Sequence, residues 1–248
     1  MPAVDVINLR RNEKDSTADF NVALIGQSTL PPVRLFLILA CSSQGREPFR
    51  HFMETIAGLP EDYSGKLNFL ISDGCAEVAA RFLLAVLVLG AGSDTNVAVD
   101  MVIHLLYSVF LPKGYLQIIK NMIGLFGEHL EEGIPWLGDG NGYVRVLLAF
   151  RIIPLLQKWE QSTLTMDSAQ KEYDRMRNAP HREDFTQRMY SSLRPSHRLA
   201  FWEFRRFGLV LPFGALNAHF NAPNVTLFSA DSGKWLQTDH TDPLYLYE

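Results

Sequence analysis

The amino-acid sequence predicts an α/β fold built around a doubly wound parallel sheet. Residues 33–40 form a short, nearly continuous apolar run, and residues 66–72 form a second one. A segment with apolar residues at helical spacing follows each run. Short apolar runs bounded by turn residues are typical of strands buried on both faces. Such strands are joined by right-handed helical crossovers, so the alternation predicts an α/β sheet.

Turn residues delimit the two predicted strands. The first, VRLFLILA, follows Pro31-Pro32 and precedes a polar turn at residues 41–45. The second, KLNFLIS, is followed by Asp73-Gly74. Because proline and glycine interrupt regular structure, both strands are predicted to be short.

A helix is predicted after each strand. The segment Glu47–Ala57 carries four apolar residues on one helical face, and Gly58 follows it. Those four are Phe49, Phe52, Met53 and Ile56. Residues 76–89 are almost entirely apolar, which predicts a buried helix that ends at the small residues 90–92.

The remainder of the chain is predicted to be mainly helical. Helices are expected over residues 97–110, 115–131, 143–160 and 166–207, with a kink at Pro154 and breaks near residues 178–180 and at Pro195. Candidate strands follow at residues 208–213 and 224–228. Residues 1–24 are expected to form an arm. Residues 25–248 are expected to form one α/β domain with a helix-rich elaboration at about residues 143–207.

Composition excludes several classes of protein. Of the 248 residues 47% are hydrophobic, which excludes intrinsic disorder, and the net charge of −4 argues against nucleic-acid binding. The N-terminus lacks an apolar signal-peptide core, and no apolar run reaches the roughly 20 residues of a membrane span. A cytoplasmic protein without a membrane segment is therefore expected. The sequence Asn224-Val225-Thr226 is a glycosylation sequon only in a secreted chain, so it is interpreted as accidental.

The charge is distributed unevenly along the chain. Residues 166–207 contain nine basic and six acidic residues, a local charge of +3 that leaves −7 for the rest. Interleaved signs favour a solvated helical face, and a surface for an acidic partner is the alternative. Aromatic residues in and just after this region are interpreted first as core packing and second as a binding surface. They are Tyr190, Phe201, Trp202, Phe204, Phe207 and Phe213.

The best-placed candidate site is the carboxyl edge of the first two predicted strands, where open α/β sheets bind ligands. The turn Cys41-Ser42-Ser43-Gln44-Gly45 opens a helix whose N-terminal amides suit an anionic group. Asp73 follows the second strand, where a carboxylate accepts hydrogen bonds from ribose hydroxyls. A nucleoside pocket is one interpretation. An ordinary turn and helix cap is the other, because the turn holds a single glycine.

Other catalytic motifs are absent from the sequence. It contains no HExxH, no GxSxG and no GxxxxGK[ST], so neither a zinc hydrolase, a nucleophile elbow nor a P-loop is predicted. The seven histidines show no metal-ligand spacing, and no metal site is expected. Cys41 at a strand-to-helix turn is interpreted as an inert thiol in preference to an activated one.

Several motifs together resemble a known family. The segments LFLILACSSQGREPFRHFM and KLNFLISDGCAEVAARFLLAVLVL, then HLLYSVFLPKGYL and PFGALNAHFNAPNVTLF, occur in this order. They resemble the fungal domain-of-unknown-function family 4470, which accompanies MYND-type zinc fingers. That family is related to the N-terminal domain of the axonemal dynein assembly factor. The resemblance implies a Rossmann-like sheet of the class I methyltransferase type.

The resemblance also implies a cofactor, S-adenosylmethionine, held by Cys41, Ser42, Ser43, Gly45 and Asp73. The first motif departs from the family pattern, because Ser42-Ser43 replaces the usual Gly-Asp. Each added Cβ restricts the backbone of such a turn. The sequence therefore favours a non-catalytic protein of interaction or assembly, with a partner surface within residues 175–207. A methyltransferase of unknown substrate is the alternative.

Overall fold

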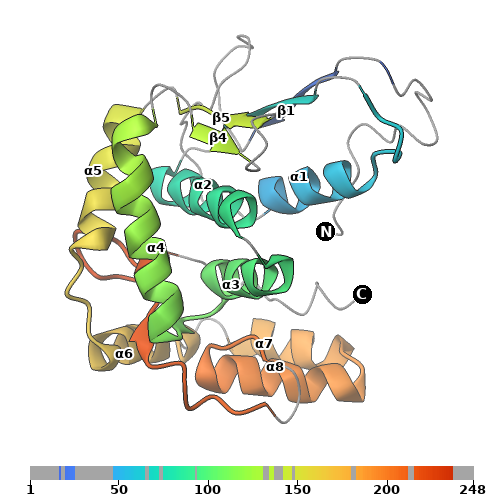
Figure 1. Ribbon diagram of the computed structural model, residues 1–248. Coiled ribbons are helices and arrows are strands. Elements are labelled where there is room, and N and C mark those ends of the chain that lie inside the picture. Colours follow the sequence, from blue (N-terminus) through green and yellow to red (C-terminus); the bar gives the residue numbers. More distant parts are fainter. Residues whose placement is uncertain are drawn as a thin grey trace.

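The computed structural model describes residues 17, 20–25, 47–64, 67–72, 75–92, 94–130, 134–136, 142–146, 149–179, 183–211 and 215–236. These residues are mainly helical, and their strands are few and short (Figure 1). One strand pair is parallel, as in an α/β fold, and the other two are antiparallel.

The parallel pair consists of β1 (Phe20–Ile25) and β2 (Leu67–Ser72). Its register places the first residues of the two strands opposite each other, and likewise the last. Strand β2 confirms the prediction for residues 66–72. Strand β1 begins inside the segment 1–24, for which the sequence predicts an arm. The strand predicted at residues 33–40 lies outside the described residues.

Two further pairs are antiparallel. Strand β3 (Phe110–Leu111) pairs with β6 (Ala222–Pro223), and β4 (Ile134–Trp136) pairs with β5 (Gly142–Val144). Across the described ranges no sheet has more than two strands. The wide Rossmann-like sheet implied by the family resemblance is therefore not seen in this part of the chain.

Helices α1 (Glu47–Ala57) and α2 (Ala76–Ala91) confirm the two predictions made for these segments. Phe49 and Phe52 of α1 are buried, and each packs edge-on against the ring of Phe82 in α2. The ring centroids lie 5.3 and 5.5 Å apart, within the range of favourable aromatic pairs. Helix α2 is buried along most of its length, as its apolar sequence predicts.

The middle of the chain contains α3 (Thr95–Tyr107), α4 (Lys113–Phe126), the 3₁₀ turn η2 (Gly127–His129) and α5 (Ala149–Glu160). The predicted helix 97–110 ends early because Phe110 and Leu111 extend into β3. The predicted helix 143–160 starts late because Tyr143 and Val144 belong to β5. These strand pairings depend on residues distant in sequence, which helical periodicity does not reveal.

Helices α6 (Met166–Arg177), α7 (Glu183–Ser192) and α8 (Pro195–Phe207) confirm the helical prediction for residues 166–207 and both of its breaks. Thr165 begins α6 with a capping box, because its hydroxyl accepts from the Ser168 backbone while the Ser168 hydroxyl accepts from the Thr165 backbone. Pro195 occupies the first turn of α8, where its missing N–H costs nothing.

The predicted tail strands at residues 208–213 and 224–228 are wrong where the structure describes them. Residues 208–211 are irregular, and Val225–Leu227 forms the 3₁₀ turn η4. The side chain of Asn224 accepts from the backbone N–H of Thr226, which favours a turn over a strand. Among the described residues of the two predicted tail strands, Phe228 alone makes a bridge, to Trp235.

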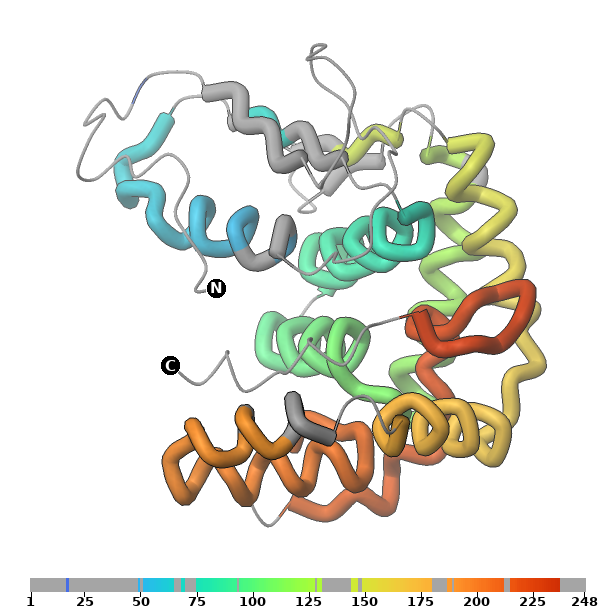
Figure 2. Tube along the Cα trace, turned by 180° about the vertical axis from the view of Figure 1, so that it is seen from behind, coloured from blue at the N-terminus to red at the C-terminus, as the bar shows by residue number. Residues whose placement is uncertain are grey.

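The described elements form stacked layers (Figure 1). Strands β1, β4 and β5 lie at one end, over α1 and α2, and α3 follows beneath α2. Helices α6, α7 and α8 lie at the other end, as the view from behind also shows (Figure 2). The main core surrounds α2, and a smaller cluster joins α6 to residues 109–110 and 227–228.

Candidate functional site

The predicted cofactor residues Cys41, Ser42, Ser43, Gly45 and Asp73 all lie outside the described residues. The structure describes the elements beside them. Strand β2 ends at Ser72 and α2 begins at Ala76, so the predicted acid falls in the short connection between strand and helix.

Cys75 lies at the N-terminus of α2, and its thiol donates to Glu77 Oε2 at 3.1 Å. Burial, the largest effect, and the Glu77 carboxylate together raise the pKa of Cys75 to about 11. The thiol is therefore protonated at neutral pH and is not a nucleophile, because only the thiolate is reactive.

The structure brings a different group of polar residues together, where α2 and α3 meet the segment of residues 208–228, called the tail below. These residues are Arg81, His104, Ser108, Asn224 and Thr226, and all are buried. The side chain of Arg81 donates from Nε and Nη2 to the carbonyl of Thr226, at 3.2 and 2.7 Å. Hydrogen bonds from a charged donor are stronger than neutral ones, so this contact ties α2 firmly to the tail.

Asn224 caps the C-terminus of α3. Its side-chain N–H groups donate to the carbonyls of His104, Leu105 and Ser108 at 3.3, 2.9 and 2.8 Å. The last carbonyls of a helix have no partner within the helix, so they need such a donor when they are buried. Asn224 Oδ1 in turn accepts from the backbone and the hydroxyl of Thr226. Every polar atom of this fully buried amide is thus used.

The Asn224-Val225-Thr226 sequence has a structural role. Asn224 is 0% exposed, and its amide nitrogen already donates to three carbonyls. A glycan cannot be attached to this nitrogen in the folded chain. The asparagine and threonine form a side-chain turn that serves the fold, which agrees with the interpretation of the glycosylation sequon as accidental.

His104 links Ser108 to Asp100. Its Nδ1 lies 2.8 Å from Ser108 Oγ, and its Nε2 lies 3.5 Å from Asp100 Oδ1. Ser108 Oγ accepts from the backbone N–H of Val210, so its own hydrogen can be donated to Nδ1. These partners assign the proton of the neutral imidazole to Nε2, facing the carboxylate.

Asp100 also accepts a hydrogen bond from the Tyr115 hydroxyl at 2.6 Å. Burial, the largest effect, and the Asp100 carboxylate together raise the pKa of Tyr115 to about 12. Tyr115 is therefore a hydrogen-bond donor at all physiological pH values. It orients the carboxylate that faces His104.

The order Ser108, His104, Asp100 resembles a hydrolase triad only in residue types. Ser108 is 0% exposed, and its oxygen already accepts from the Val210 N–H. A nucleophile must reach a substrate carbonyl, which this buried hydroxyl cannot do. The relay is therefore structural and holds α3 against the tail.

Acidification is expected to destabilise the protein through His104. Burial is the main cause that lowers the pKa of His104 below its ordinary value of 6.5; His219 contributes and Asp100 opposes. Below about pH 6.5 the unfolded chain therefore binds more protons at His104 than the native chain does. The contribution of neutral His104 to the free energy of unfolding is complete above pH 6.5 and is lost as the pH falls towards the native pKa. Urea unfolding at pH 7, 6 and 5 should show a smaller loss for His104→Gln than for the wild type. Identical losses would exclude this role of His104.

The arginines of α6 and α8 mostly cap helix ends. Arg177 donates to the carbonyls of Arg205 and Arg206, while Arg205 donates back to the carbonyl of Arg177 at 2.7 Å. The hydroxyl of Tyr173 donates to the carbonyls of Phe204 and Arg205. The C-terminus of α8 is thus held rigidly against α6, because cations and donors stabilise this end of a helix.

One face of α8 exposes apolar side chains. Leu199 and Trp202 are 53% and 56% exposed, whereas Phe201 of the same helix is buried. The Trp202 ring packs edge-on against Tyr190 of α7, with centroids 5.8 Å apart. Core packing, the first interpretation of these aromatic residues, therefore holds for Phe201 and fails for Trp202. The sequence signal is the spacing of Leu199, Trp202 and Arg206, which places them on one face.

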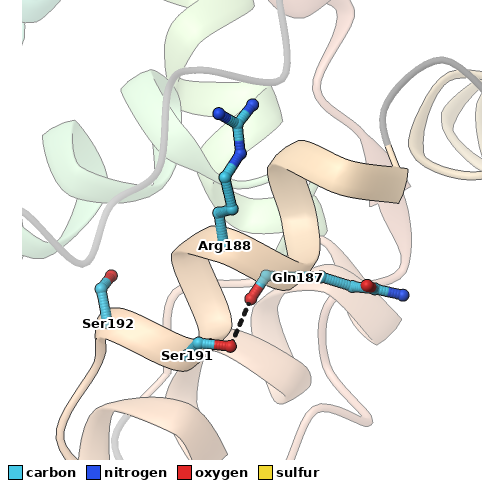
Figure 3. A pocket seen from close by; sticks show the side chains of 4 residues that line it. All are labelled: Gln187, Arg188, Ser191 and Ser192. Carbon is cyan, nitrogen blue, oxygen red and sulfur yellow. Dashed lines mark hydrogen bonds between the residues drawn. The ribbon is translucent and has the colours of Figure 1, made fainter.

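A broad hollow of about 830 Å³ lies beside α7, and Gln187, Arg188, Ser191 and Ser192 line it (Figure 3). All four come from one helix, and their side chains point in different directions. Ser191 donates its hydroxyl proton to the carbonyl of Gln187 at 2.8 Å. The lining residues do not converge on a reacting atom, which a catalytic pocket requires.

Two features are absent from the described part of the chain. No three His, Cys, Asp or Glu side chains there are grouped to hold a metal ion. No described helix is both long enough and apolar enough to cross a membrane.

Comparison with curated proteins and with solved structures finds no match. The model of one family matches the N-terminal part of the chain, from residue 1 to residue 111. This family is described as Domain of unknown function (DUF4470). The matched part includes α1, α2, α3 and both strands of the parallel pair. Residues 1–111 of the chain therefore match the DUF4470 family model, which supports the family that the motifs of the sequence resemble.

Proposed function

We propose that the chain is a non-catalytic protein of interaction or assembly on a methyltransferase-like scaffold. The observation that carries this proposal is the exposed apolar face of α8, formed by Leu199 and Trp202. Tryptophan is enriched at the energetic centres of protein interfaces, and its exposure to water is unfavourable. The sequence predicts a partner surface somewhere within residues 175–207, and we propose this face of α8 as that surface.

The contacts that fix α8 to the rest of the protein support a binding role. Phe201 and Phe204 anchor the inner side of the helix in the protein, and Tyr173 and Arg177 hold its C-terminal carbonyls. The exposed side chains therefore sit on a rigid element. A preorganised surface loses little conformational entropy on binding.

The buried polar groups support a non-catalytic role. His104, Ser108 and Arg81 are used in hydrogen bonds that join α2 and α3 to the tail. Cys75 is held as a protonated thiol. These groups therefore contribute to the fold and offer neither a nucleophile nor an accessible general base.

The double variant Leu199→Ser/Trp202→Ser is expected to lose its partner while keeping its fold, because both side chains are largely exposed. The measurement is quantitative mass spectrometry of proteins crosslinked to the chain in extracts of its source cells. Phe150→Ser on α5 is the matched control, because Phe150 is 64% exposed and lies outside the proposed surface. Identical partner sets for the wild type and the double variant would overturn the proposal, provided that both unfold at the same temperature.

An S-adenosylmethionine-dependent methyltransferase is the second candidate. The parallel pairing of β1 and β2 favours it, because nucleoside pockets form beyond the carboxyl ends of parallel strands. If the cofactor binds, Asp73→Ala should weaken binding by about 1–3 kcal/mol, the scale of a lost buried hydrogen-bonding partner. Unchanged affinity in this variant would place the pocket elsewhere.

A further inference from the structure

The face of α8 carries positive charge beside its apolar side chains. The helix contains Arg198, Arg205 and Arg206 against one acid, Glu203. Arg206 is exposed, and the contact described for its guanidinium is with the ring of Phe207, 5.0 Å from the centroid. Helical spacing places Arg206 in line with Leu199 and Trp202. The exposed Glu203, four residues after Leu199, lies at the edge of the same face. An apolar stripe thus has an arginine in line with it and one acid at its edge.

The other two arginines of α8 are engaged in the fold yet keep their charge. Arg198 donates to the carbonyls of Leu193 and Ser191, and its guanidinium lies 5.3 Å from the centroid of the Tyr190 ring. Arg205 donates to the carbonyl of Arg177. Carbonyl partners do not neutralise a guanidinium, so both contribute to a positive potential around Trp202.

We propose that this α8 face binds a short acidic segment of a partner protein, with apolar side chains on Leu199 and Trp202 and a carboxylate on Arg206. This inference rests on the proposed function and names the chemistry of the partner. Leu199 and Arg206 are seven residues apart, about 10 Å along the helix. The partner must therefore present an apolar side chain and a carboxylate at about that separation.

The charge of the whole chain favours a short segment over a long polyanion. The region 166–207 carries +3, while the rest of the chain carries −7. A nucleic acid would meet the acidic remainder and be repelled. A short acidic segment can contact the three arginines of α8 without reaching the acidic remainder, so complementary charge aids its association.

The test uses three fluorescently labelled helical peptides. All three carry the same leucines at helical spacing, and they differ only in the residues that lie seven positions after those leucines. These residues are glutamate, glutamine or lysine in the three peptides. Fluorescence anisotropy with the intact chain is expected to give affinities in the order glutamate, glutamine, lysine, with about tenfold between the first and the last. Equal affinities for the glutamate and lysine peptides would overturn the acidic specificity.

Charge reversal localises the contact. Arg206→Glu is expected to weaken binding of the glutamate peptide about fivefold and to strengthen binding of the lysine peptide. Arg151→Glu on α5 is the matched control, because Arg151 is also exposed and also lies over the ring of a neighbouring phenylalanine. Arg205→Glu is unsuitable, since Arg205 holds α6 and α8 together. Equal effects of Arg206→Glu and Arg151→Glu would contradict a contact at Arg206.

The outcomes separate this inference from the proposed function. If all three peptides bind equally to the wild type and not to Leu199→Ser/Trp202→Ser, the acidic specificity fails and the α8 surface stands. If the double variant binds as the wild type does, the surface itself fails. Stronger binding to phosphatidylserine vesicles than to the glutamate peptide would replace the protein segment with a membrane surface and overturn the inference.

Discussion

Asn224→Ala is expected to lower the free energy of unfolding by about 3–4 kcal/mol. The change removes the donor to three carbonyls at the end of α3 and the acceptor for Thr226. The His104 carbonyl keeps the backbone N–H of Ser108 as its donor, whereas the carbonyls of Leu105 and Ser108 lose the amide. Each buried carbonyl left without a partner costs about 1–3 kcal/mol, and relaxation recovers part of this cost. Urea unfolding followed by circular dichroism measures the loss.

Two further variants make the Asn224 prediction specific. Asn224→Asp preserves the shape but turns an oxygen toward the three carbonyls, so it should destabilise the protein more than alanine does. Asn221→Ala is the control, because Asn221 is exposed in the same segment, and it should change stability by less than about 0.5 kcal/mol. A loss of less than about 1 kcal/mol for Asn224→Ala would show that α3 is not capped in this way.

Gly208→Ala is expected to cost about 3 kcal/mol. Gly208 ends α8 with φ of +66°, which favours glycine, and its carbonyl accepts from the Val109 N–H at 2.7 Å. A Cβ there would lie 2.8 Å from the Cβ of Val109 and 3.3 Å from Cε1 of Tyr173. The strained backbone contributes about 1 kcal/mol and the forced displacement of Val109 about 1–3 kcal/mol.

Gly233→Ala is the matched control for this prediction. Gly233 has φ of +65°, but an added Cβ would meet only Leu164 Cδ1, at 3.9 Å. The backbone cost is therefore shared by the two variants, and the packing cost applies to Gly208 alone. Thermal and urea unfolding should show a clearly larger loss for Gly208→Ala. Equal losses would contradict the close approach of α8 to Val109.

Local sequence patterns predicted the helices well. The boundaries of α1 follow from four apolar residues on one face and the glycine after them, and α8 begins at the proline where a start is expected. The pairing of β3 with β6 was not predicted, because it joins segments about 110 residues apart. Short strands whose partners are distant carry little periodic signal, so the predicted helix 97–110 ran past Tyr107.

The candidate site shows the same limit. Asp100, His104 and Ser108 recur every four residues, a visible helical spacing, yet nothing local shows that His104 is buried against Phe220. The motifs around Arg81, His104 and Asn224 belong to the resemblance, but their meeting point depends on the tertiary fold. The predicted cofactor residues lie outside the described residues, so that prediction stays a prediction.

The hydrogen bonds of the tail connect the segment matched by the family model with residues beyond it. The family match ends at residue 111, whereas Arg81 and the end of α3 bind Thr226 and Asn224. The matched segment therefore completes its buried polar contacts with residues more than one hundred positions later. A fragment limited to residues 1–111 would expose the carbonyls of α3 and the side chain of Arg81.

Calorimetric titration of the intact chain with S-adenosylmethionine tests the central claim, a non-catalytic interaction protein on a methyltransferase-like scaffold. Methyl transfer needs a bound and aligned cofactor, so an active enzyme must bind it. S-adenosylhomocysteine, the demethylated product, serves as the second ligand. We expect no binding heat and no shift of the unfolding temperature at millimolar concentrations of either compound. A saturable heat at one site per chain, weakened by Asp73→Ala, would contradict the claim and favour the methyltransferase alternative.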